Sequence, residues 1–129
     1  MTDSIDLSRT FVHLSNQGDA ECVELTPDFW RQSSARPLYD RLVGSFQFNS
    51  AEDLHSSMQE MHPEADELLF LVSGARDVIL QEVGGERTVT LRSGQAAIVP
   101  RGVWHRLVMR EPGKLLLINS RTGMESRDS

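Results

Sequence analysis

Residues 62–74 read HPEADELLFLVSG, and this stretch decides how the chain folds. A polar turn leads into the apolar run Leu68–Val72, whose length and composition are typical of a buried strand. Residues 94–105, GQAAIVPRGVWH, repeat this succession, with an apolar strand candidate between two glycine-containing turns. Both stretches therefore predict strands of a sheet, and a histidine stands at one end of each stretch.

The rest of the chain also divides into short strand candidates separated by turns. Gly84-Gly85 predicts a hairpin, because paired glycines adopt the positive φ angles that two-residue loops need. Turns at intervals of roughly 8–12 residues are typical of an all-β sandwich or barrel. The expected strands are Phe11–Leu14, Glu21–Leu25, Arg41–Phe48, Met58–His62, Glu67–Ser73, Asp77–Val83, Glu86–Arg92, Ala96–Val99, Trp104–Met109 and Lys114–Asn119.

Two segments outside these strands have other signals. Thr26-Pro27-Asp28 combines a capping residue, a proline at the first helical position and an acid, and predicts a short N-terminal helix or turn through Trp30. The tail 121–129 is polar and is expected to be loose. We expect one domain over residues 1–129, with the barrel core at about 40–120.

The stretch before His62 permits two interpretations. Ser50-Ala51-Glu52-Asp53 resembles the capped start of a helix that continues to Met61. The alternative is a strand, in which Met58, Glu60 and His62 share one face because strand side chains alternate. Local propensity leaves both open.

Composition excludes several functional classes. The chain has 129 residues, a formal net charge of −6 and 39% hydrophobic residues, as expected of one acidic globular domain. The negative charge argues against nucleic acid or an anionic membrane as the main partner. The first residues lack the pattern of a signal peptide, and Cys22 as the single cysteine permits no internal disulfide. We therefore expect a cytoplasmic protein.

The two opening stretches resemble the two sequence motifs of the cupin superfamily. The first motif is G-x5-H-x-H-x(3,4)-E-x6-G. His62 stands at its second histidine, Glu67 at its glutamate and Gly74 at its last glycine. The second motif is G-x5-P-x-G-x2-H-x3-N, and its first four defined positions are filled by Gly94, Pro100, Gly102 and His105. The resemblance implies a small antiparallel β-barrel of the jelly-roll-like, double-stranded β-helix type.

Three positions depart from the family pattern. Leu54 replaces the first glycine, Glu60 the first histidine and Met109 the final asparagine. Glu60 matters most for chemistry, because metal-binding members of the family use the position it occupies. Carried over position by position, the resemblance implies a metal site made of Glu60, His62, Glu67 and His105.

These residue types suit a divalent metal. Imidazole and carboxylate together bind Fe, Mn, Ni or Zn, and His62, Glu67 and His105 alone form a two-histidine, one-carboxylate set of the kind used for oxygen chemistry at non-haem iron. An ionised Glu60 in the shell would neutralise the site, which would then attract an anionic substrate less. Glu60 could instead act as a general base beside the metal. A third possibility is a barrel that has lost its metal, with Glu60 marking the loss.

The resemblance leaves several functions open. The first hypothesis is a metal-dependent enzyme of the dioxygenase, isomerase or decarboxylase type, acting on a small polar metabolite, with Glu60 as ligand or proton shuttle. The alternative is a binding or sensing module without turnover, with or without metal. We expect a small-molecule ligand, and the resemblance implies a homodimer, since an N-terminal edge strand invites pairing.

Overall fold

The computed structural model of the chain describes residues 4–26, 39–54, 57–120 and 122–128. Within these ranges the chain forms nine strands and one turn of 3-10 helix. The elements are β1 Thr10–Ser15, β2 Ala20–Glu24, β3 Tyr39–Phe48, η1 Ala51–Leu54, β4 Met58–Met61, β5 Glu67–Glu82, β6 Gly85–Arg92, β7 Ala96–Val99, β8 His105–Asn119 and β9 Glu125–Asp128. The short helix or turn expected through Trp30 lies outside the described residues.

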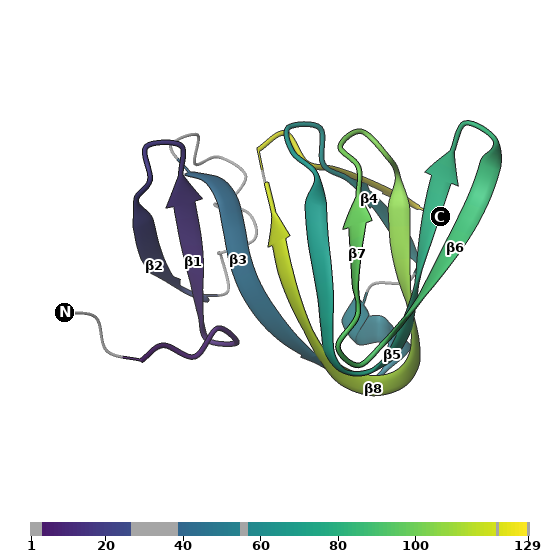
Figure 1. Cartoon of the computed structure of the whole chain (residues 1–129), viewed down its shortest axis with the longest axis horizontal. Coiled ribbons are helices and arrows are strands. Elements are labelled where there is room, and N and C mark those ends of the chain that lie inside the picture. The colour runs from purple at the N-terminus through teal and green to yellow at the C-terminus, as the bar shows by residue number, and fades with distance from the viewer. Residues whose placement is uncertain (1–3, 27–38, 55–56, 121, 129) are drawn as a thin grey trace.

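Two long strands, β5 and β8, join the two layers of the molecule (Figure 1). In one layer Leu68 of β5 lies opposite Ile118 of β8 and Ile98 of β7, and β3, β1 and β2 continue the sheet. In the other layer Leu80 lies opposite His105 and Arg87 of β6, while β4 and β9 pair beyond β8. The predicted antiparallel, all-β barrel is confirmed, although its strands do not close into a complete ring.

Gly74 and Gly113 allow β5 and β8 to bend from one layer into the other without ending. Gly74 has a φ of 88°, and a Cβ placed on it would lie 2.5 Å from the Pro112 carbonyl oxygen. The register of the pair shifts repeatedly between Leu71 and Arg76. The sequence wrongly predicted that strands would end here, because it reveals the turn-forming residues but not the close crossing of two backbones.

The irregular stretch also exchanges the faces of β5. Before it, Glu67, Leu69 and Leu71 point into the barrel, and after it Val78 and Leu80 do so. A single inserted residue reverses the alternation of a strand. The inward-facing side chains therefore have odd residue numbers before the irregular stretch and even residue numbers after it. The main core comprises Phe48, Leu69, Leu71, Val78, Leu80, Leu91, Val99, Leu115 and Leu117.

Other expectations can be compared with the structure element by element. The expected hairpin is confirmed, but its two-residue turn is Val83-Gly84 and not Gly84-Gly85, since Gly85 already pairs with Glu82. The ambiguous segment contains both alternatives in succession, a turn of 3-10 helix at Ala51–Leu54 and then strand β4. The tail was expected to be loose, but Glu125–Asp128 forms β9 because β4 offers it a free edge. No helix in the described residues is long and apolar enough to cross a membrane, and the cytoplasmic location stays a prediction.

On the outer side of β5, Asp77 is buried and held by two neighbouring strands. Arg110 lies 2.5 and 2.7 Å from Oδ2 through Nη2 and Nε, and Thr90 donates to Oδ1 at 2.8 Å. Burial alone would raise the pKa of Asp77, but the hydrogen bonds from Arg110 and Thr90 lower it. The lowered pKa means that this carboxylate stabilises the fold above its unfolded pKa of about 3.9 and loses that effect as the pH falls through the lower folded pKa.

We expect Arg110→Ala to lower the free energy of unfolding by about 1 kcal/mol, because it removes the charged partner of Asp77 at a site that is open to solvent on the arginine side. Urea unfolding at pH 7 measures this loss. The difference from the unsubstituted protein should shrink below about pH 4, where Asp77 is protonated in the unfolded chain. Arg92→Ala, at an exposed position of β6, is the control and should change little. Equal losses in the two variants would contradict the assignment.

Candidate metal centre

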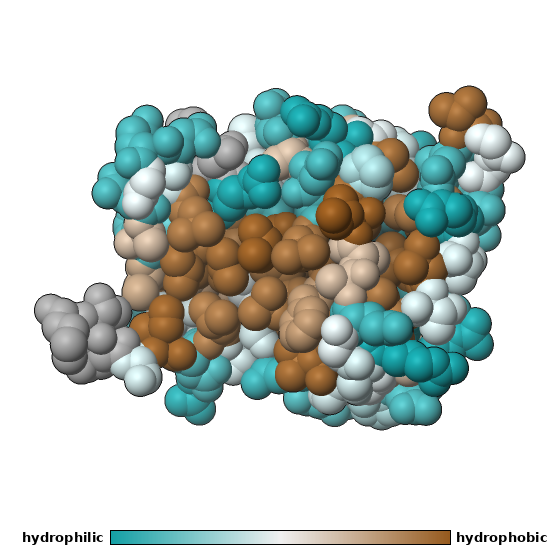
Figure 2. Space-filling view, viewed as in Figure 1, coloured by the Kyte–Doolittle hydropathy of each residue, from teal (hydrophilic) through white to brown (hydrophobic). Residues whose placement is uncertain are grey.

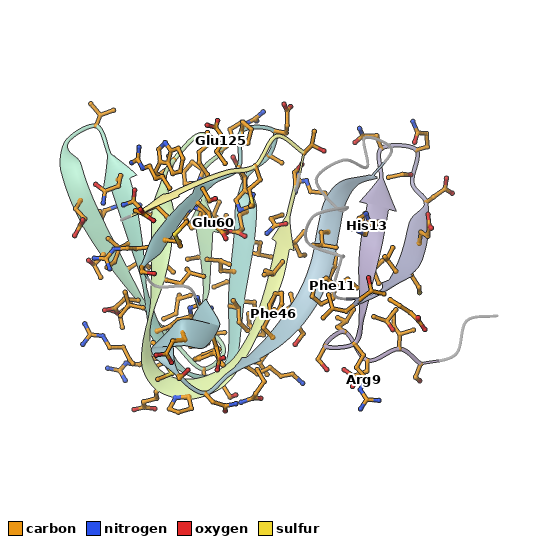
Figure 3. All side chains as sticks on the ribbon, turned by 180° about the vertical axis from the view of Figure 1, so that it is seen from behind. Arg9, Phe11, His13, Phe46, Glu60 and Glu125 are labelled. Atoms are coloured by element: carbon orange, nitrogen blue, oxygen red, sulfur yellow. The ribbon has the colours of Figure 1, made fainter. Side chains whose placement is uncertain are left out.

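Four side chains that the sequence singled out meet at one end of the barrel. Strand β5 begins there with Glu67, and strand β8 begins there with His105. Glu60 belongs to β4 and lies opposite His105, while His62 follows β4 directly. Figure 3 shows Glu60 at the same end of the barrel as Glu125, far from the N-terminal strand that carries His13. Residues distant in sequence therefore form one cluster.

The two histidines face the buried carboxylate of Glu67. His105 Nε2 lies 3.0 Å from Oε1 of Glu67, and His62 Nε2 lies 3.5 Å from Oε2. All three side chains are almost completely buried, with exposed fractions of 2–4%. Glu60 is more open: its side chain is 38% exposed, and its Oε2 lies 4.0 Å from His62 Nε2. Glu60, His62 and His105 each offer one atom within 4.8 Å of the others.

Backbone carbonyls fix the tautomer of both histidines. His62 Nδ1 donates to the Ser120 carbonyl oxygen at 2.9 Å, and His105 Nδ1 lies 3.3 Å from the Val103 carbonyl oxygen. A ring whose Nδ1 carries the proton presents the lone pair of Nε2. His62 Nε2 has no hydrogen-bond partner among the described residues, and neither has Glu67 Oε1, because His105 Nε2 at 3.0 Å carries no proton in this tautomer. Both nitrogens are thus oriented as metal ligands usually are.

Glu67 is kept ionised by its surroundings. Burial would raise its pKa, but hydrogen bonds from His105 and His62, whose Nε2 atoms can donate only in the imidazolium form, hold the pKa well below its usual range. The reciprocal effect acts on His105, where burial lowers the pKa and the interaction with Glu67 more than offsets this, so that the pKa is raised. The cluster therefore attracts positive charge to Glu67, whether a proton or a metal ion.

Asn119 is a member of the site that sequence reasoning missed. Its Nδ2 donates to Glu67 Oε2 at 2.7 Å, and its side chain is buried. This contact orients the carboxylate in the way that partners of metal ligands do. The available signal was the alternation Leu115, Leu117, Asn119, in which an amide takes the third inward position of an apolar strand.

Arg76 was missed as well, and it lies inside the barrel. Its side chain has no exposed surface and packs over the ring of Phe48, with 5.4 Å from the guanidinium carbon to the ring centroid. Burial lowers the pKa of Arg76 to about 10, while the charge of Glu67 opposes that change, so the guanidinium remains protonated at neutral pH. From the sequence alone Arg76 falls between two expected strands, because the continuous strand β5 and its exchange of faces are invisible without the structure.

The donor set fits a divalent metal ion. Two imidazole nitrogens with fixed tautomers, one buried carboxylate and one half-exposed carboxylate converge at one place. Such nitrogen and oxygen donors suit Fe, Mn, Ni or Zn rather than the softer ions that prefer thiolates. Orphaned buried atoms of His62 and Glu67 provide an independent observation in favour of a bound ion.

The fold and this cluster define the class of protein. The cupin domain model matches residues 52–119, which is more than half of the chain, and the chain therefore belongs to the cupin family. The matched range contains all four residues of the cluster and Arg76. No curated protein sequence matches the chain.

Similar solved structures share the fold at low sequence identity. The R92A mutant of oxalate decarboxylase from Bacillus subtilis has a TM-score of 0.54 and 18% identity over 70% of this chain. A protein of unknown function from Streptococcus pyogenes has a TM-score of 0.51 and 18% identity over 63% of this chain. The matches span only 24% of the decarboxylase and 64% of the Streptococcus protein. At this identity the likeness shows the fold alone.

Proposed function

We propose that this protein is a metal-dependent enzyme that acts on a small polar metabolite bound at the open end of the barrel. The observation that carries the proposal is the pair of buried histidine Nε2 atoms facing Glu67, each with its Nδ1 turned to a backbone carbonyl. His62, Glu67 and His105 would hold the ion. A bound divalent ion would supply Lewis acidity to an oxygen of the substrate.

Glu60 is assigned a different role from Glu67. It reaches the same histidines, but its exposed side chain lies at the rim and not in the interior. We assign it as an exchangeable fourth ligand that a substrate oxygen displaces, after which the freed carboxylate accepts a proton. The decarboxylase, isomerase and dioxygenase types all require such a proton acceptor or an open coordination position.

Metal analysis tests the proposal directly. Protein purified without a metal-affinity tag should contain close to one equivalent of Fe, Mn, Ni or Zn, and adding the ion to stripped protein should raise the unfolding midpoint. A metal content below about a tenth of an equivalent per chain, together with no thermal shift for any of the four ions, would contradict the metal proposal. A tightly held metabolite in native mass spectrometry that is never converted would favour a binding or sensing module.

Glu60→Gln should weaken metal binding moderately. We expect about a tenfold loss of affinity, or about 1.4 kcal/mol, with full occupancy still reached at higher metal concentration. The reason is that three ligands remain and the lost contact is solvent-exposed. A competition titration against a chelator measures the change. Complete loss of retention would show instead that Glu60 is an essential ligand.

We also propose that the outer face of the β1–β3–β8–β5–β7 layer is the interface of a homodimer. Figure 2 shows a continuous apolar band across this face. The strand registers explain the band, because they align side chains of neighbouring strands in rows across the sheet. The first row comprises Val12, Val43, Ile118, Leu68 and Ile98, and the second includes Leu116, Phe70 and Ala96.

A second copy of the chain fits this face in size and in chemistry. Five strands spaced about 4.8 Å apart, with two rows about 7 Å apart along the strands, give an apolar area of roughly 340 Å². A standard interface covers about 800 Å² on each partner, of which somewhat more than half is apolar. Neither row contains a charged residue, and flat sheet faces pack well on one another.

Leu68→Asp should convert the dimer to monomer, because a charge in the middle of the first row would be desolvated at the interface. Light scattering coupled to gel filtration measures the mass. Val83→Asp is the matched control, since Val83 is a fully exposed valine at the β5–β6 hairpin. If the unsubstituted protein is a monomer at micromolar concentration, the interface proposal is wrong.

A further inference from the structure

The guanidinium of Arg76 is the most unusual charged group inside the barrel. Its side chain has no exposed surface, yet Nε, Nη1 and Nη2 have no hydrogen-bond acceptor among the described residues. Arginine carries five N–H donors in a fixed fork, and leaving such donors buried and unpaired is costly. A buried ionised group of this kind calls for an acceptor that the chain does not itself provide.

Glu67 is the only negative group that acts on Arg76 among the described residues, and it does not pair with it. Its charge raises the pKa of Arg76 through the interior, but its own oxygens face the two histidines and Asn119. A divalent ion on the histidine cluster would neutralise Glu67 further. With such an ion and both carboxylates ionised, the interior would still carry one net positive charge, contributed by Arg76.

This count changes the charge expected from the sequence alone. Glu60 and Glu67 would make a divalent site neutral, and a neutral site attracts anions weakly. The guanidinium restores a positive interior, and low dielectric surroundings strengthen its attraction for an anion. A carboxylate matches the planar fork of arginine with two parallel hydrogen bonds.

The position of Arg76 in the sheet separates it from the metal ligands. Leu80 lies opposite His105, and Arg76 stands four residues before Leu80 in β5, which separates their Cα atoms by about 13 Å. Phe48 and Leu71 make the surroundings of this part of the barrel apolar. A ligand that reaches both places needs an oxygen donor at one end, an acidic group at the other and a short carbon chain between them.

We propose that Arg76 is the binding residue for the carboxylate of a small organic acid, whose other oxygen-bearing end meets the metal centre. This inference rests on the proposed function for the metal end, but the Arg76 end can be tested without metal. It names the substrate class as small bifunctional carboxylates and not neutral sugars or phosphate esters.

The test uses thermal unfolding of the full chain with and without bound metal. The probes are malonate, succinate and glutarate, with acetate, phosphate and chloride at equal ionic strength for comparison. At ten times its dissociation constant, a dicarboxylate should raise the midpoint by about 3–6 °C. Arg76→Met should abolish this shift while metal content stays unchanged. Arg92→Met, at an exposed position, should leave the shift intact.

The stability of Arg76→Met without ligand separates a binding role from a structural one. Replacing an unpaired buried charge by an apolar side chain of similar size should leave the midpoint equal or higher. If Arg76→Met does not fold, Arg76→Lys carries the test, since lysine keeps the charge but not the fork. An unchanged dicarboxylate shift in that variant would overturn the proposal.

Three further results would overturn the proposal: no probe raises the midpoint of the unsubstituted protein, phosphate acts while carboxylates do not, or Arg76→Met keeps the shift. Failure of the metal proposal gives a different result. The protein then binds no Fe, Mn, Ni or Zn, while a dicarboxylate shift that depends on Arg76 persists and supports the carboxylate site.

Discussion

Glu67→Gln protein should emerge from purification without metal and should not regain it at micromolar concentrations. Among the described residues, Glu67 is the one buried carboxylate that contacts both histidines, at 3.0 and 3.5 Å. Glutamine keeps the shape and can still accept the hydrogen bond from Asn119, but it removes the charge that balances the ion. Removing a residue that only hydrogen-bonds to a metal ligand already lowers metal affinity by about 10–100-fold. We therefore expect the loss of the ligand Glu67 itself to lower metal affinity by more than about 100-fold.

The control for this change is Glu64→Gln. Glu64 is exposed in the turn between His62 and Glu67, so the net charge changes equally while the cluster is untouched. Elemental analysis and a chelator competition should find the control indistinguishable from the unsubstituted protein. Full metal retention by Glu67→Gln would place the ion elsewhere and refute the three-residue centre.

Gly113→Ala should strongly destabilise the fold. A Cβ on Gly113 would collide with the Ser73 carbonyl group and would lie 2.7 Å from the Cα of Gly74. These are backbone atoms at the crossing of β5 and β8, and backbone cannot move aside as a flexible side chain can. We expect a loss of about 4 kcal/mol or more in the free energy of unfolding, a large share of the stability of a domain of this size.

Gly84→Ala is the matched control for this glycine. A Cβ at Gly84 meets no atom within 4 Å, and its φ is not in the left-handed region. The change should therefore alter stability by less than about 1 kcal/mol. Circular dichroism in urea compares the two variants. If Gly113→Ala were as stable as Gly84→Ala, the close crossing of the two strands would be wrong.

The sequence predicted the strands and the clustered residues well, because both depend on local signals. Alternation and turn glycines located the β5–β6 hairpin to within one residue, and motif spacing selected His62 and His105. The structure brings these histidines together with Glu60 and Glu67, although their role as ligands stays a prediction.

What the sequence could not predict depends on contacts between distant segments. Gly74 signals a turn by its residue type, but only the approach of Pro112 explains why the strand bends and continues. Arg76 lay between two expected strands in the sequence, and only the irregular register of β5 explains why its side chain is buried in the barrel. The tail pairs as β9 because β4 has a free edge, which no property of the tail itself reveals.

The pairing of β5 with β8 also affects how fast the chain folds. Leu80 and His105 are 25 positions apart, and Leu68 and Ile118 are 50 apart. Sheets built from such remote pairs fold slowly, over milliseconds to seconds, because a long loop must close before its contacts form. Glu67 and His105 are brought together by the pairing of β5 with β8, so a metal ion bound to both residues would stabilise the finished barrel.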